Sequence, residues 1–356
     1  MPQVKLGLIG GGYLGSIHAR LALTQPDVHL VAVADPDPAA RERLSAMGIP
    51  AVDDVDELLD QVEAAIVACP THLHYPVARR LLEHNIHLLI EKPVTSSVGE
   101  LDELVALAEE HHLVLQVGHV ERFNPAWTAA RPMISRACWI RAVRTSGYPC
   151  RSTDIGVVAD LMIHDLDLVL LMVGSPLVEI HAAGSVVVGP HEDTADAWLT
   201  FANGATAALT ASRVSHQAQR CLQIVTPEGT LDLDLAAQRC WYQRPDRERL
   251  EKLSLEKLDP DQRQQLKNRF FDDFLPRISI PVAERNALYD EQRDFIECVR
   301  TGKPPRVSAR DIRPVMVLVE QIVEQISRFT HRNRLRACPK VPSDTAPVVR
   351  LRRKAG

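Results

Sequence analysis

A glycine-rich turn near the N-terminus constrains the fold of this chain more than any other stretch. The apolar run 4–9 leads into Gly10-Gly11-Gly12-Tyr13-Leu14-Gly15, which satisfies the pattern GxGxxG, and a helix is expected over residues 16–24. The first glycine permits a tight turn, the second lets a pyrophosphate approach the backbone, and the third lets the helix pack closely. Free amides at the helix start would bind the phosphates. The motif therefore predicts a dinucleotide-binding unit.

An acidic residue at the end of the next predicted strand specifies the dinucleotide. Residues 29–34 form an apolar run that ends in Asp35, about twenty residues after Gly15. A carboxylate at this position binds the adenosine ribose hydroxyls and repels a 2′-phosphate, so NAD is favoured over NADP. A plain glycine turn would account for the glycines but not for Asp35.

Strands and helices then alternate up to about residue 120. Apolar runs at 64–68, 87–90 and 114–117 are of strand type, and 75–84 and 97–111 show helical periodicity. This alternation predicts a doubly wound parallel sheet with its ligand at the carboxyl ends of the strands. Residues at those ends are expected to contact the cofactor: Thr71, His74, Glu91, Lys92 and Pro93. His72 and His119 also lie there, and any of these histidines could be only a polar rim residue.

Lys92 is the candidate for acid–base chemistry in this first domain. It follows four apolar strand residues, where a nicotinamide ring would lie. Desolvation and a neighbouring positive charge both lower a lysine pKa, which makes an amine useful near neutral pH. The alternative is an ordinary surface lysine at a strand end.

The apolar stretch 156–174 carries a line of polar residues. At about 3.6 residues per turn, Asp160, His164 and Asp167 fall on one helix face while Asp165 points elsewhere. Ionisable groups in so apolar a helix need partners, so this face should meet a cleft, a ligand or a polar network. From the helix alone, a structural network, a proton-transfer site and a metal site are all open.

Composition bounds the class of protein. The 356 residues suggest two domains, and 46% hydrophobic with 24% charged residues is ordinary for a globular chain. A net charge of −5 argues against nucleic acid as a partner. Scattered cysteines without CxxC pairs suggest a reducing compartment. The N-terminus leaves no room for a signal peptide, and no apolar run is long enough to span a membrane, so a cytoplasmic location is expected.

The motifs together resemble a known family. The motifs are GGGYLG, Asp35, Glu91-Lys92-Pro93, Arg122-Phe123-Asn124-Pro125 and Asp160-x3-His164-x2-Asp167. Their order resembles that found in the glucose-fructose oxidoreductase, inositol dehydrogenase and rhizopine-catabolism family. The resemblance implies an α/β protein: a Rossmann domain over 1–120, then a domain over 121–330 with a large open, mostly antiparallel sheet, whose last helices pack back on the first domain. Strand-like runs at 139–145, 178–188, 195–201, 205–212 and 222–226 are compatible with it. An uncovered sheet face suggests a homodimer or homotetramer.

The resemblance also implies roles for three residues. Lys92 corresponds to the lysine that binds the reacting hydroxyl, His164 to the catalytic histidine, and Asp160 to its acidic partner. The chemistry implied is hydride transfer from a sugar or polyol carbon to NAD, with His164 as general base. Asp160 would orient the imidazole, Asp167 would at most anchor the helix, and no metal is expected.

Within the family, HVERFNP, ADLMIHDLDLVL and TASRVS are most similar to the bacterial UDP-N-acetylglucosamine 3-dehydrogenases. This implies oxidation of the sugar C3 hydroxyl to a ketone, which an aminotransferase then aminates for lipid A synthesis. Residues expected to contact the substrate are Lys92, Arg122, Asn124, Tyr148, Asp160, His164 and Arg213, with Arg220 as a further diphosphate candidate. Any of these arginines could instead form a surface salt bridge. A dehydrogenase of unphosphorylated sugars or polyols and a non-catalytic nucleotide sensor are the alternatives.

Two segments lie outside these motifs. Residues 244–268 are rich in charge and contain two prolines, which indicates a solvated excursion, helical in part, whose leucines could cover a neighbouring subunit. Residues 331–356 form a basic stretch expected to be a loose tail, with attraction to anionic lipid or a partner enzyme as the alternative.

Overall fold

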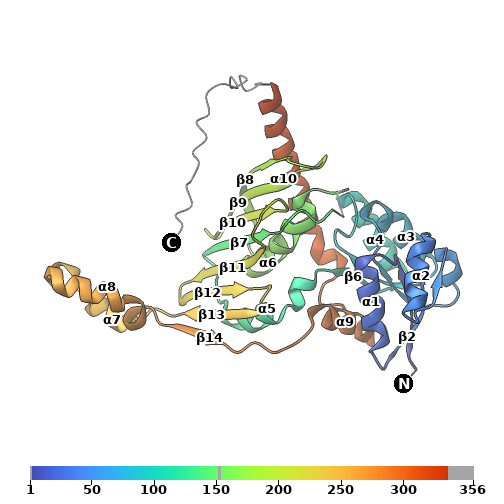
Figure 1. Ribbon diagram of the computed structural model, residues 1–356, viewed down its shortest axis with the longest axis horizontal. Helices are drawn as coiled ribbons and strands as arrows, with labels where there is room; N and C mark the ends of the chain where they lie inside the picture. The colour runs from blue at the N-terminus through green and yellow to red at the C-terminus, as the bar shows by residue number, and fades with distance from the viewer. Residues whose placement is uncertain (1, 151–153, 336–356) are drawn as a thin grey trace, which may run out of the picture.

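The computed structural model describes residues 2–150 and 154–335. Two sheets organise these residues, and Figure 1 shows the first domain, in blue and cyan, beside the broad second sheet. A long C-terminal helix runs along both. The expectation of a Rossmann domain followed by a domain with a large, mostly antiparallel sheet is confirmed.

The first sheet is parallel and doubly wound. Its six strands lie in the order β3-β2-β1-β4-β5-β6. The strands are β1 (Val4–Ile9), β2 (Val28–Ala34), β3 (Ala51–Val52), β4 (Ala64–Val67), β5 (His87–Glu91) and β6 (Leu115–Gly118), and the helices are α1 (Tyr13–Leu23), α2 (Pro38–Ala46), α3 (Thr71–Glu83) and α4 (Val98–Glu110). The strand order reverses between β1 and β4, which is where such sheets bind ligands. The predicted start of α3 at residue 75 is wrong by four residues, because the helix continues through Pro76.

The second sheet has eight strands in the order β14-β13-β12-β11-β7-β10-β9-β8, and β7 and β10 form its parallel pair. The strands are β7 (Trp139–Thr145), β8 (Leu177–Ser185), β9 (Thr194–Phe201), β10 (Thr206–Ser212), β11 (Gln219–Thr226), β12 (Gly229–Asp234), β13 (Arg239–Gln243) and β14 (Arg277–Ile280). The last three are not evident in the sequence, because polar residues interrupt their short apolar patterns. One face of this sheet is covered by α5 (Pro125–Ala130), α6 (Ile163–Val173) and α10 (Ala309–Leu335).

The apolar stretch 156–174 begins as one turn of π-helix, Val158–Met162, and continues as α6. Gly174 ends the helix in the left-handed conformation, with φ of 55°. Eight of the eleven residues of α6 are buried, since the helix lies between the second sheet and the end of the first domain. π turns are frequent at functional sites, and here one carries Asp160.

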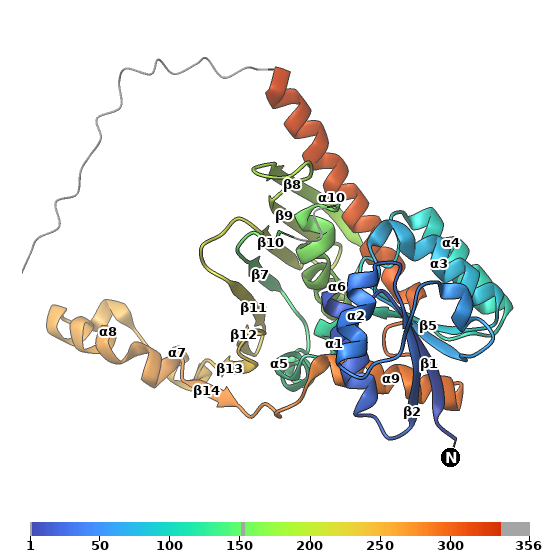
Figure 2. The same cartoon turned by 45° about the vertical axis from the view of Figure 1, so that its right-hand side comes forward.

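Helices α9 (Ala287–Thr301) and α10 return to the first domain. Helix α9 packs on α1 and β1, and α10 packs on α4 and β6 at one end and on α6 and β8 further along, as Figures 1 and 2 both show. Because α10 extends to Leu335, the basic stretch predicted from residue 331 begins inside a helix. Its remainder, 336–356, lies outside the described residues. Within the described ranges, no helix is long and apolar enough to cross a bilayer.

Residues 244–276 form an arm that leaves the edge of the second sheet. It contains α7 (Arg247–Lys252) and α8 (Pro260–Phe274), and β14 brings the chain back to β13. Figure 1 shows the arm projecting away from both domains. Neither helix has a buried residue, and Leu255 and Phe271 are exposed. The predicted solvated, partly helical excursion agrees with this arrangement.

A carboxylic acid is buried between α9 and the first sheet. Glu291 is fully buried, and neither of its carboxyl oxygens has a hydrogen-bond partner in the part of the chain that the structure describes. Burial first, then the negative charges of Glu91 and Asp294, raise the pKa of Glu291 well above its usual range. The folded protein therefore holds this side chain in its neutral form.

This neutral carboxyl makes the stability of the fold pH-dependent. A carboxyl whose pKa is raised on folding stabilises the fold fully below its unfolded pKa and loses that contribution as pH rises through the folded pKa. Glu291→Gln does not titrate, so its free energy of unfolding relative to the wild type should increase between pH 5 and pH 8 in urea unfolding. Glu297→Gln, an exposed change on the same helix, is the control. A difference that stayed constant with pH would contradict the neutral state.

Candidate active site

A cavity of about 750 Å³ lies at the carboxyl ends of the first sheet. Predicted cofactor residues line most of it: Gly10, Gly12, Tyr13, Leu14, Asp35, Thr71, His74, Glu91 and Lys92. Asp160, from the π turn of the second domain, lines it as well. Gly15 and Pro93 are not part of the lining. The cavity thus extends from the glycine turn to Asp160 in the π turn before α6, while His164 and Asp167 are not part of its lining.

The glycine turn has the shape that a dinucleotide requires. Gly10 has a φ of 99°, and a Cβ there would lie 2.7 Å from the carbonyl oxygen of Ala68. At Gly12 a Cβ would meet nothing within 4 Å, which leaves open space above the backbone. A Cβ on Gly15 would lie 1.8 Å from the Gly10 carbonyl oxygen, so only glycine allows this approach. Within the described residues no side chain caps α1, and the start of this helix, Tyr13 and Leu14, lines the cavity, which suits a pyrophosphate.

Asp35 is fixed in the same cavity, beside the glycine turn. Its Oδ2 accepts a hydrogen bond from the Gly11 amide (2.6 Å) and its Oδ1 accepts one from the Asp37 amide (2.8 Å). These contacts hold the carboxylate beside the glycine turn, where ribose hydroxyls are bound in such folds. The turn, the uncapped helix and Asp35 together fit NAD.

Two of the predicted cofactor residues brace the site from inside the protein. Glu91 is buried, and its Oε1 lies 2.8 Å from Nε2 of His18 on α1. Burial alone would raise the pKa of Glu91, but the His18 ring and Lys92 lower it overall. The ring of His74 bridges the carbonyl oxygens of Cys69 and Pro93, each at 2.8 Å, and burial lowers the pKa of His74. These contacts hold the loop after β5 in place around Lys92.

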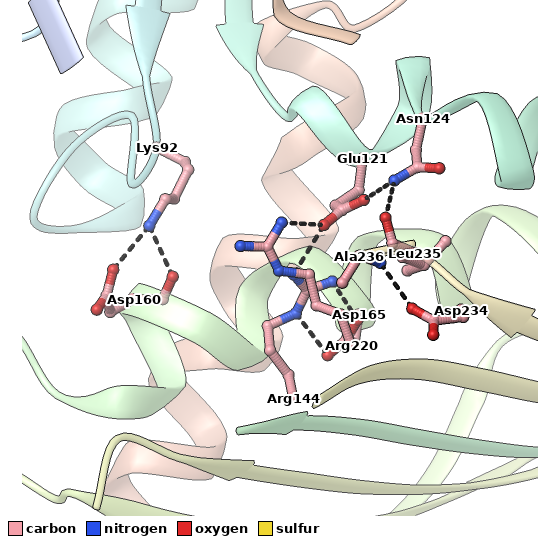
Figure 3. Close-up of polar contacts among 10 residues, drawn as sticks. All are labelled: Lys92, Glu121, Asn124, Arg144, Asp160, Asp165, Arg220, Asp234, Leu235 and Ala236. Atoms are coloured by element: carbon pink, nitrogen blue, oxygen red, sulfur yellow. Dashed lines mark hydrogen bonds and ion pairs between the residues drawn. The ribbon is translucent and has the colours of Figure 1, made fainter. Parts of the chain in front are cut away.

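Lys92 connects the two domains. Its Nζ donates to Oδ1 of Asp160 (2.8 Å) and to the Asp160 carbonyl oxygen (2.6 Å), and both side chains are mostly buried (Figure 3). An ammonium group has three donors, so two of them hold the lysine and one is left for a ligand. The alternative of an ordinary surface lysine does not agree with this geometry.

Asp160 does not have the partner that the sequence predicts. Its carboxylate pairs with Lys92, and no hydrogen bond joins it to His164 among the described residues. The spacing i, i+4 suggested contact with the imidazole, but Asp160 belongs to the π turn and His164 to the α-helix that follows. The structure therefore makes Asp160 the partner of the catalytic lysine candidate.

His164 is buried and neutral. Its Nδ1 has no hydrogen-bond partner within the described residues. Burial first, then the positive charges of Lys92 and Arg144, lower the pKa of His164 well below its usual value. A neutral imidazole at neutral pH can accept a proton, which a general base must do.

Arg122, predicted to bind substrate, is instead an internal partner of α6. Its Nε and Nη2 donate to the two carboxylate oxygens of Asp167, at 2.8 Å and 2.5 Å, and both side chains are buried. Asn124 is also structural: its amide donates to Glu121 and to the Leu235 carbonyl oxygen, and its Oδ1 caps α5. The sequence alone could not show that Asp167, on the predicted polar face, would form an ion pair with Arg122.

Arg213 is likewise withdrawn from the cavity. It is completely buried, its Nε donates to Asp193 (2.7 Å) and its Nη1 donates to the Ile155 carbonyl oxygen (2.8 Å). Tyr148 is half-buried, with its ring 5.7 Å from the Arg213 guanidinium carbon. Neither residue lines the cavity, so the prediction that they contact substrate has no support from their positions.

A second ion-pair network lies behind His164 and was not predicted. Arg144 of β7 is fully buried and donates to Asp165 (2.7 and 3.0 Å) and to Glu121 (2.8 Å), as Figure 3 shows. Arg220 of β11 lies 3.7 Å from the same Glu121 but its side chain is 54% exposed. In the alternating pattern of β7, Arg144 falls on the same face as the buried Ile140 and Ala142, so a charge on the apolar face of the predicted strand was the only signal for it.

The predicted polar face of the 156–174 stretch meets the end of the first domain and the segment that directly follows β6. Asp160 pairs with Lys92, the His164 ring lies against His119, and Asp167 pairs with Arg122. Asp165, which the spacing placed elsewhere, faces the second sheet through Arg144. Among the described residues, no group of three or more histidine, cysteine or acidic side chains could hold a metal ion.

The position of Asp35 predicts coenzyme preference. Asp35→Asn removes the charge and can keep only part of the contact with the Gly11 and Asp37 amides. We expect NADH binding, followed by fluorescence titration, to weaken about tenfold, as loss of charge-assisted hydrogen bonds implies. NADPH binding should tighten, because the repulsion of its 2′-phosphate is gone. Asp60→Asn, an exposed change outside the cavity, serves as the control. If Asp35→Asn left the ratio of NADH affinity to NADPH affinity unchanged, the role of Asp35 in coenzyme preference would be refuted.

The Arg122–Asp167 pair predicts a stability effect. Arg122→Met leaves a buried carboxylate unpaired and should lower the free energy of unfolding by about 3–5 kcal/mol in urea. Arg122→Met combined with Asp167→Leu should recover part of that loss, since no charge remains buried. If Arg122→Met kept full stability while raising the KM for substrate, the arginine would be a ligand contact after all.

Comparison with known proteins agrees with this site. The family described as oxidoreductase family, NAD-binding Rossmann fold, matches residues 4–119, and the GFO/IDH/MocA C-terminal domain matches residues 138–232. UDP-N-acetylglucosamine 3-dehydrogenase from Acidithiobacillus ferrooxidans is 37% identical over 238 residues, which are 66% of this chain and 75% of that protein.

Solved structures give the same relation. The structure of the Acidithiobacillus ferrooxidans UDP-N-acetylglucosamine 3-dehydrogenase superposes with a TM-score of 0.80 at 30% identity, over 92% of this chain and 99% of that one. Levoglucosan dehydrogenase, solved with NADH and L-sorbose, shares the fold with a TM-score of 0.76 at 18% identity, over 92% and 98% of the two chains. This chain therefore belongs to the GFO/IDH/MocA family of NAD-binding oxidoreductases.

Proposed function

We propose that this protein oxidises the C3 hydroxyl of UDP-N-acetylglucosamine to the 3-keto sugar with NAD. The observation that carries the proposal is the Lys92–Asp160 pair at the end of the cofactor cavity, beside a neutral, buried His164. The likeness to a UDP-N-acetylglucosamine 3-dehydrogenase supports the choice of sugar.

The residues divide the chemistry between them. Bound NAD supplies the hydride acceptor. Lys92, held by two contacts to Asp160, uses its third donor to orient the reacting hydroxyl. His164 takes the hydroxyl proton on Nε2 as the carbon–hydrogen bond breaks. Burial of both groups excludes water and strengthens their electrostatic interactions with the substrate.

Arg220 is the proposed partner of the substrate diphosphate. Of the three arginines considered from the sequence, Arg122 and Arg213 are buried in ion pairs, whereas the side chain of Arg220 is half-exposed. It lies close enough to His164 for its charge to lower the pKa of that ring. Its contact with Glu121 at 3.7 Å is loose, so the guanidinium can donate to phosphate oxygens.

The reaction implies a partner step. A 3-keto nucleotide sugar is a substrate for amination, so an aminotransferase of lipid A synthesis is the proposed consumer of the product. The cytoplasm, which supplies both NAD and nucleotide sugars, is the proposed place of action.

We also propose a homodimer or homotetramer joined through the open face of the second sheet. Trp198 of β9 is 43% exposed on that face, and the half-buried Trp139 and Trp241 lie on neighbouring parts of the sheet. Large apolar side chains on a broad sheet face are typical of an interface.

The substrate is tested by incubating the protein with NAD and UDP-N-acetylglucosamine, together with the aminotransferase and glutamate to remove the ketone. A new amino sugar, detected by mass spectrometry, is the expected product. Turnover of myo-inositol or a free hexose with none of the nucleotide sugar would redirect the assignment to a free sugar or polyol dehydrogenase. Absence of any turnover would favour a nucleotide-sensing role.

The roles of the two candidate catalytic residues are tested by Lys92→Met and His164→Asn. Each should lower kcat by about 10²–10⁴-fold, as expected for a lost proton-transfer group or its orienting partner. Since the pKa of His164 is depressed, the acidic limb of kcat/KM should fall below pH 6.5 in the wild type. Lys303→Met, an exposed change outside the cavity, is the matched control. Activity within a few-fold of wild type in either site variant would refute the mechanism.

A further inference from the structure

Two buried histidine rings that carry unpartnered nitrogens lie next to each other beside the site. His119 follows β6 directly and is completely buried, and its ring stands edge-on to His164, with centroids 6.0 Å apart and planes at 66°. Neither Nδ1 of His164 nor Nε2 of His119 has a hydrogen-bond partner in the described ranges. His119 is therefore not the polar rim residue that its place after a strand suggested.

The other side of the His119 ring faces a fixed carboxylate. Its Nδ1 lies 3.2 Å from Oδ2 of Asp167, within ion-pair distance although the N–H is not aligned as a hydrogen bond. Burial alone would raise the pKa of Asp167, but His119 and Arg122 lower it overall, so the carboxylate stays ionised. An ionised carboxylate favours a proton on the nearer nitrogen, Nδ1, which leaves Nε2 of His119 as an acceptor.

His164 needs such an acceptor if it acts as a base. When Nε2 takes the substrate proton, the neutral ring must carry its own proton on Nδ1. A buried N–H without an acceptor destabilises the state that carries it. The neighbouring ring of His119, with its centroid 6.0 Å away, carries an unpartnered nitrogen that one bridging water can connect to this N–H.

We propose that His119 is a positioning residue, which, backed by Asp167, fixes the tautomer and orientation of His164 through its Nε2. The proposal rests on the proposed function, in which His164 takes the hydroxyl proton. The substrate proton goes to Nε2 of His164 and the hydride goes to NAD. The Nδ1–H of the resulting imidazolium donates to His119, at which no bond is made or broken.

The other charged groups around His164 do not offer it an acceptor. Lys92 after β5, Arg144 from β7 and Arg220 from β11 are cations that lower the pKa of His164, and a protonated His119 ring acts in the same direction. On its own element, Asp160 is held by Lys92 and Asp165 by Arg144. Among the described groups around this ring, His119 carries ring nitrogens that have no hydrogen-bond partner.

The kinetic test uses His119→Phe, which keeps a planar ring but removes the acceptor. We expect kcat to fall on the order of tenfold to a hundredfold, as for other outer partners of site histidines, with the sugar KM within about twofold. The acidic limb of the kcat profile should shift in the same variant. His119→Gln, which restores an acceptor, should recover most of the rate. His87→Gln changes a histidine at the start of β5, the end of the strand away from Lys92. This variant is the control and should match the wild type.

A second readout needs no turnover and separates this proposal from the choice of substrate. The tautomer of His164 can be read from the NMR spectrum of protein labelled with 15N-histidine, in which the His164 signals are assigned by their disappearance in His164→Asn. We expect the Nδ1–H tautomer in the wild type and a mixture of the two tautomers in His119→Phe. If the phenylalanine variant does not fold, His119→Asn, too short to reach His164, carries the same expectation. An unchanged His164 tautomer, or a kcat in His119→Phe equal to that of His87→Gln, would overturn the proposal. Failure of UDP-N-acetylglucosamine as substrate would not alter the tautomer result.

Discussion

The contact between Lys92 and Asp160 is the interaction on which the arrangement of this protein depends. It joins the end of a strand in the first domain to the π turn that opens the buried helix of the second. At this contact the cofactor cavity meets the first residue of the polar face of the 156–174 stretch. The two carboxylates on α6 are also paired, Asp167 with Arg122 of the segment after β6 and Asp165 with Arg144 of the second sheet, so the apolar helix leaves neither charge unpaired.

Much of the first domain could be predicted from the sequence, because its signals are local. The turn at Gly10 to Gly15 depends on backbone space that only glycine leaves, and Asp35 follows at the distance set by one βαβ unit. The face shared by Asp160, His164 and Asp167 could also be predicted, because helical spacing determines it. Each of these inferences needed only residues close together in the chain.

The partners of the charged residues could not be predicted in this way. Arg122 and Arg213 are cations of the kind that a diphosphate would need. Each instead forms an ion pair with a carboxylate that lies 20 or more positions away in the sequence. Arg220 differs from them only in exposure, which composition and spacing do not report. His119 looked like a rim residue because its neighbours in the chain do not reveal that α6 covers it. Pairing across the fold, rather than residue type, decides which group is left to meet a ligand.

The long helix α10 has a mechanical consequence. On one side, Arg313 binds Asp102 and Glu320 accepts from the Val98 amide, both at α4 of the first domain. Further along, Gln325 exchanges two hydrogen bonds with the backbone of β8, at Ile180 and Ala182. Because one continuous helix is hydrogen-bonded to both domains, it resists bending of one domain relative to the other. The two halves of the site are thus held at a preset separation, and substrate exchange falls to side chains and loops at the mouth of the cavity.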